Sequence, residues 1–122
     1  MRYGIVHHLA GNIDALTDID RQFDAAEVNS KICLGGIVGL YPFVNETVEF
    51  LIQQKYRAVK NYRDATFARG GPYDGYSTVF LVDVLKYARP RTSKRALDYL
   101  KELPSHFVDR GWRFVSLFDP GL

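Results

Sequence analysis

The chain has 122 residues, of which 47% are hydrophobic and 25% are charged, and these proportions are typical of one soluble globular domain over residues 1–122. Its formal net charge of +2 is too small to indicate binding to nucleic acid or to a membrane surface. The single cysteine, Cys33, excludes an internal disulfide, and no apolar stretch is long enough to cross a bilayer. We therefore expect a cytoplasmic protein.

The first half of the sequence alternates strand and helix patterns. Short runs at residues 2–6, 31–34 and 56–60 predict three strands. Asn12 is a good cap for a helix whose apolar residues recur at steps of three and four, and Asn45 can cap a second helix. Strands joined by helices of this length predict an α/β fold with a partly parallel sheet and flanking helices.

In a parallel sheet of this kind, ligands bind beyond the carboxyl ends of the strands. The loops that follow the three predicted strands are residues 7–12, 35–42 and 61–70. We therefore expect any binding or catalytic site to lie in these three loops.

The second half begins with a loop and continues into helices. Residues 69–77 are rich in glycine and tyrosine, which predicts a loop. Residues 78–88 are mostly apolar and predict a helix that Pro90 stops, because proline cannot continue the backbone hydrogen bonds of a helix. Thr92 or Ser93 can cap the helix that follows.

The last part of the sequence predicts a hairpin. The preceding helix should end at Pro104. Residues 106–109 and 112–117 predict two strands, joined by a tight turn at Asp109-Arg110-Gly111.

Three segments at the candidate loops share a pattern with a known family. The segments are Met1–Asn12, Ile32–Gly39 and Ala58–Asp64. In order and spacing they resemble the metal-binding motifs of calcineurin-like metallophosphoesterases, especially the small bacterial and archaeal phosphodiesterase branch. The resemblance covers residues 1–68 and continues weakly through Lys94–Pro104.

The resemblance implies half of a larger fold. Members of the family pack two sheets face to face, and this chain would supply the first half of that sandwich and stop where the second sheet continues, as a domain truncated at its C-terminus. In the family, two metal ions polarise a phosphate group and generate the hydroxide that attacks it.

The resemblance also implies that most of the metal ligands have been replaced. The family's first Asp, first His, bridging Asp, Asn ligand and the His that assists the leaving group correspond here to His8, Ala10, Gly36, Tyr62 and Arg63. Of the third motif only Asp64 is kept, and Phe118 stands near the position of a later histidine. Without a bridging carboxylate nothing offsets the repulsion between two divalent ions, so we expect no metal site and no cofactor.

A single divalent ion is the alternative to this expectation. Manganese, iron or zinc could use His8, because imidazole is a common ligand. His7 and His8 are adjacent, however, and on an extended strand they would point to opposite faces and could not chelate one ion together.

Arg63 suggests a different use of the same pocket. A guanidinium group binds phosphate with two parallel hydrogen bonds. We hypothesise that a phosphate-containing ligand such as a nucleotide is held by Arg63, His8 and the backbone amides of Gly35 and Gly36. The competing interpretation is that Arg63 is exposed or forms a structural ion pair.

These observations favour a pseudoenzyme that acts by binding, either to a phosphate-containing ligand or to a protein partner. Half of a sandwich would leave a sheet face or edge uncovered, so we expect a homo-oligomer or a complex with another protein. The alternative is a residual phosphoesterase or phosphodiesterase with an atypical metal site. In that case His8 would be a ligand or base, Arg63 a phosphate clamp and Asp64 an orienting carboxylate.

A run of five basic residues between Lys86 and Arg95 could contact nucleic acid by pairing with phosphates. The simpler interpretation is a solvated connection between two helices. We therefore expect no nucleic-acid partner.

Overall fold

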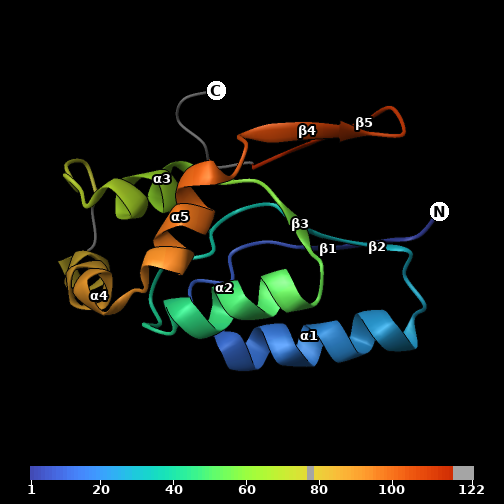
Figure 1. Ribbon diagram of the computed structural model, residues 1–122, viewed down its shortest axis with the longest axis horizontal. Coiled ribbons are helices and arrows are strands. Elements are labelled where there is room, and N and C mark those ends of the chain that lie inside the picture. The colour runs from blue at the N-terminus through green and yellow to red at the C-terminus, as the bar shows by residue number, and fades with distance from the viewer. Residues whose placement is uncertain (77–78, 117–122) are drawn as a thin grey trace.

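The computed structural model describes residues 1–76 and 79–116. Three parallel strands, β1 (Tyr3–Val6), β2 (Ser30–Cys33) and β3 (Arg57–Ala58), form a sheet in the order β1-β2-β3. Helices α1 (Ile13–Ala25) and α2 (Val44–Gln53) connect the strands and lie next to each other on one face of the sheet (Figure 1). The predicted α/β fold with a partly parallel sheet and flanking helices is confirmed.

Alternate residues of the strands face these two helices. Val6 and Cys33 are buried in the main core, and Gly4 lies directly under the ring of Phe23 on α1. Cys33 is fully buried, as its apolar surroundings in the sequence predict, and burial raises the pKa of its thiol to about 12. A thiol with this pKa stays protonated and packs as a small apolar side chain.

The opposite face of the sheet is covered by an antiparallel hairpin. Strands β4 (His106–Asp109) and β5 (Trp112–Val115) form this second sheet, which Figure 1 shows on the side away from α1 and α2. Phe107 and Phe114 stack on each other and pack with Ile32 of β2 and with Val59, which directly follows β3. The predicted hairpin is therefore present, and its turn residues Arg110 and Gly111 both have positive φ, as a two-residue hairpin loop requires.

The remaining helices lie beside the sheet rather than beneath it (Figure 1). They are α3 (Tyr62–Arg69), α4 (Val79–Ala88), a 3₁₀ turn η1 (Arg89–Arg91) and α5 (Lys94–Glu102). The side-chain oxygen of Ser93 accepts a hydrogen bond from the amide of Ala96, so Ser93 caps α5 as expected. Pro90 lies in η1, directly after the end of α4, where it was expected to stop the helix.

Two local predictions are wrong. Residues 61–70 were expected to form a loop, but all except the two end residues belong to α3. Asn45 does not cap α2; it lies inside the helix, where its side chain donates to the carbonyl of Arg91 and accepts from the amide of Ser93. The reason is a tertiary contact, because these two bonds join α2 to the segment that starts α5.

In the part of the chain that the structure describes, no helix is long and apolar enough to cross a membrane. Residue 117, at the end of the predicted last strand, and Phe118 lie outside the described residues.

Candidate functional site

The first two candidate loops are joined by backbone hydrogen bonds. Beyond the end of β1, the amides of His8, Ala10 and Gly11 donate to carbonyl oxygens of the loop that follows β2, at 3.2, 2.8 and 2.7 Å. In the reverse direction, the amide of Tyr41 donates to the carbonyl of Ala10 at 2.8 Å. The pairing of β1 with β2 therefore continues into the loops and fixes their relative position.

Asp64 fixes the second loop to α3. Its two carboxylate oxygens accept hydrogen bonds from four backbone amides, those of Gly36, Ile37, Val38 and Asn61, at 2.9 to 3.1 Å. The side chain of Asn61 in turn accepts from the amide of Asp64 at 2.9 Å, which completes a capping box at the start of α3.

Asp64 is completely buried, and this has two electrostatic consequences. Burial raises the pKa of its carboxyl to about 6, although the four amide hydrogen bonds act in the opposite direction. The carboxylate oxygens are also occupied by these four backbone hydrogen bonds, so Asp64 orients the loop and does not contact a bound ligand. Gly36, which was expected to offer its amide to a phosphate, donates that amide to Asp64 instead.

Arg63, one residue earlier on α3, faces a cavity. This cavity has a volume of about 400 Å³ and is lined by His8, Ala10, Leu40, Arg63 and Leu81. The structure thus brings together His8 and Arg63, as the sequence predicted. Leu40 lies in the predicted 35–42 loop but was not itself a candidate. Sequence reasoning missed Leu81, because only the fold brings α4 to the loop that follows β2.

The Arg63 guanidinium has no counter-ion in the described residues. The side chain is half-buried, and no hydrogen bond or ion pair involves it within residues 1–76 and 79–116. Gly39 leaves room for it, since a Cβ atom there would lie 3.1 Å from Nη1 of Arg63 and 2.7 Å from Cβ of Ala10. The competing interpretation was an exposed arginine or a structural ion pair. Arg63 is half-buried, and no ion pair is seen for it in the part of the chain described.

His8 has a left-handed backbone conformation, with φ of 56°. This turns its ring toward His7, so that the two Nδ1 atoms are 2.7 Å apart. The prediction that the two rings point to opposite faces is therefore wrong, because it assumed an extended backbone. At this distance the two rings share one hydrogen bond, in which one nitrogen donates and the other accepts. Partial burial, followed by the proximity of His7 and Arg63, lowers the pKa of His8.

The donor set does not fit a two-metal centre of the kind that the resemblance implies. Ala10 and Gly36 provide no side-chain ligand, and the ring of Tyr62 packs edge-on against Tyr76 at 6.2 Å. Among the described residues, no three His, Cys, Asp or Glu side chains are grouped closely enough to hold an ion.

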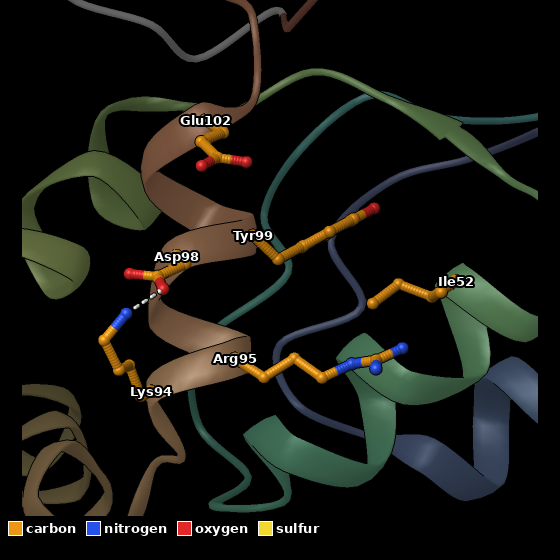
Figure 2. A pocket seen from close by; sticks show the side chains of 6 residues that line it. All are labelled: Ile52, Lys94, Arg95, Asp98, Tyr99 and Glu102. Atoms are coloured by element: carbon orange, nitrogen blue, oxygen red, sulfur yellow. Dashed lines mark hydrogen bonds and ion pairs between the residues drawn. The ribbon is translucent and has the colours of Figure 1, made fainter.

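A second hollow lies between α2 and α5 and has a volume of about 490 Å³. Figure 2 shows its lining, in which Lys94 pairs with Asp98 at 2.7 Å. Arg95 pairs with Glu49 at 2.7 Å. Because Lys94 and Arg95 each have a carboxylate partner, this groove would attract an anion less strongly than the cavity at Arg63.

The basic run between Lys86 and Arg95 is also largely occupied by internal contacts. Besides the ion pairs of Lys94 and Arg95, Arg89 donates to the carbonyls of Phe67 and Ala68 at the end of α3. These bonds join η1 to the last turn of α3, where the backbone carbonyls lack their usual partners four residues on.

Solved structures that resemble this one include two with high TM-scores. A hypothetical protein from Pyrococcus horikoshii OT3 is 23% identical, with a TM-score of 0.75 over 88% of this chain and 50% of that protein. A metallophosphoesterase from Sphaerobacter thermophilus is 25% identical, with a TM-score of 0.72 over 93% of this chain and 45% of that protein. A comparison with protein-family models finds no match, and neither does a comparison with curated proteins.

The fold is therefore metallophosphoesterase-like and corresponds to part of the two-sheet sandwich. The chain spans about half the length of each of these two solved structures.

Proposed function

We propose that this chain is a non-catalytic protein of metallophosphoesterase-like fold that binds a phosphate-containing ligand at Arg63 and His8. The observation that supports this most is the side chain of Arg63, which is half-buried, lines a cavity and has no carboxylate partner among the described residues. A partly buried charge without a partner is costly, and an anion bound beside it removes that cost.

The loss of the metal ligands supports the non-catalytic part of the proposal. Where the resemblance places an aspartate and a histidine, the chain has Gly36 and Ala10, which provide no side-chain donor. Arg63 places a permanent positive charge at the same loops. Arginine can orient a phosphate, but it does not generate the hydroxide that a metal centre supplies.

Replacing Arg63 by Gln should weaken binding of inorganic phosphate at least tenfold, because hydrogen bonds to a charged group contribute about 1.5–3 kcal/mol. Titration of the full chain followed by NMR chemical shifts, with calorimetry for nucleotides, measures this. The matched control is Arg21→Gln, since Arg21 is an exposed arginine on α1, 3.9 Å from Asp18. The proposal fails if neither phosphate nor any nucleotide shifts the signals of residues around the cavity.

The alternative function is a phosphoesterase with a single metal ion. It is favoured by the two imidazole Nδ1 atoms of His7 and His8, which lie 2.7 Å apart. Under our proposal the purified chain shows no turnover of a chromogenic phosphodiester with added manganese. Turnover that disappears in His8→Ala but persists in His106→Ala would replace the proposal with this alternative.

Self-association is a further part of the proposed role. Three apolar side chains on α4 are largely exposed, namely Val79, Phe80 and Tyr87 at 76%, 64% and 54%. Exposed aromatic residues commonly anchor interfaces between proteins. We expect light scattering at high concentration to give a mass above that of the 13.9 kDa monomer, and Phe80→Ser to lower it. A monomer at every concentration would rule out this part of the proposal.

A further inference from the structure

Building on the proposed anion site, we infer that the ligand is a soluble phosphate ester with a small apolar or aromatic body. Its phosphate group lies at Arg63, and its body lies between Leu40 and Leu81. This inference concerns the part of the cavity that a phosphate group alone would leave unfilled.

The size and lining of the cavity support an apolar body. A volume of about 400 Å³ is within the range of sites that enclose whole small molecules and is generous for a phosphate group. Three of the residues that line it, Ala10, Leu40 and Leu81, carry aliphatic side chains. A ligand that covered Leu40 would also remove apolar surface from water, since this side chain is 46% exposed.

The charges support a ligand with a single anionic group. Among the described residues that line the cavity, Arg63 is the one with a permanent charge. His8, the other polar side chain there, has a lowered pKa because of its partial burial and the nearby His7 and Arg63. In a site that is open to water, a single arginine binds a phosphate group only weakly. The rest of the affinity must therefore come from contacts with the body of the ligand.

The test compares three soluble probes, inorganic phosphate, phenyl phosphate and phenol, titrated into the full chain and followed by NMR. We expect phenyl phosphate to bind about tenfold more tightly than inorganic phosphate, since part of a phenyl ring is buried. Phenol should bind more weakly than phenyl phosphate, and Arg63→Gln should weaken both phosphates.

Leu40→Ser is the decisive variant, because its side chain is at the surface and its loss should leave the fold intact. It should weaken the binding of phenyl phosphate about threefold more than the binding of inorganic phosphate, because the deleted side chain contacts the body of the ligand. The control is Val108→Ser, which removes an apolar side chain, 60% exposed, from the hairpin on the far face of the sheet. It should change neither affinity.

The outcomes separate the two proposals. Failure of both phosphates to bind would refute the anion site itself. Equal affinity for inorganic phosphate and phenyl phosphate, or a preference that Leu40→Ser leaves intact, would refute the apolar body and keep the anion site. Binding to vesicles containing phosphatidic acid without binding to phenyl phosphate would also overturn the inference, because the ligand would then be a lipid headgroup at a membrane surface.

Discussion

Asp64→Asn is expected to lower the free energy of unfolding by about 3 kcal/mol at pH 7, because it leaves buried amide donors without an acceptor. The carboxylate of Asp64 accepts four backbone hydrogen bonds in a fully buried position. An asparagine side chain has one acceptor oxygen, and its NH₂ group would face two of these donors. Chemical denaturation of the wild type and the variant measures the difference.

The control for this variant is Asp83→Asn. Asp83 is an exposed aspartate on α4, so the same chemical change there should shift the free energy of unfolding by less than about 0.5 kcal/mol. Equal effects of the two substitutions would contradict the structural role assigned to Asp64.

The stability difference should also depend on pH. Burial raises the pKa of Asp64 from 3.8 to about 6 in the folded state. Between about pH 4 and pH 6 the folded state therefore binds more protons at this position than the unfolded state, so rising pH in this window lowers the wild-type stability. The Asp64→Asn variant has no titrating group at this position. We expect the difference between wild type and variant to be larger at pH 4 than at pH 7.

Gly11→Ala is the second substitution with a large expected effect. Gly11 has φ of 76°, and a Cβ atom added there would overlap the carbonyl oxygen of Tyr41, which is backbone and cannot rotate away. The left-handed conformation costs a residue with a Cβ about 1–2 kcal/mol, and forced overlap adds a further 1–3 kcal/mol. We expect a loss of about 3 kcal/mol or more in the free energy of unfolding.

Gly111→Ala separates these two contributions. Gly111 has a similar φ of 82°, but a Cβ atom there would meet nothing within 4 Å. It should therefore cost only the backbone term, about 1–2 kcal/mol. If thermal and chemical unfolding show the same loss for both glycine variants, the close approach of the two loops at Gly11 is not the cause.

Asp64 and Gly11 matter to the proposed function because they fix the loops that carry His8 and Leu40. The first loop is held to the second by backbone hydrogen bonds, and the second is held to α3 by Asp64. Arg63 is the residue that precedes this anchor on α3. The loops that line the cavity are therefore held in place by hydrogen bonds of their own backbone amides. A ligand in the cavity would contact side chains rather than these amides.

The sequence by itself determined the local elements of this protein. Asn12 and Ser93 cap their helices as expected, because a cap depends only on residues two or three positions along the chain. The alternation of strand and helix patterns was enough to predict a parallel sheet, and the turn at Arg110-Gly111 was enough to predict the hairpin. The spacing of the three loops was enough to bring His8 and Arg63 to one cavity.

Only the tertiary structure decided how these elements use their side chains. Asp64 bonds to Gly36, 28 residues away, and Asn45 bonds to the carbonyl of Arg91, 46 residues away, so neither role is visible in a local pattern. Leu81 joins the cavity because α4 folds back onto the loop that follows β2. Periodicity and capping report interactions within one element, whereas burial and charge pairing depend on which elements the folded chain brings into contact.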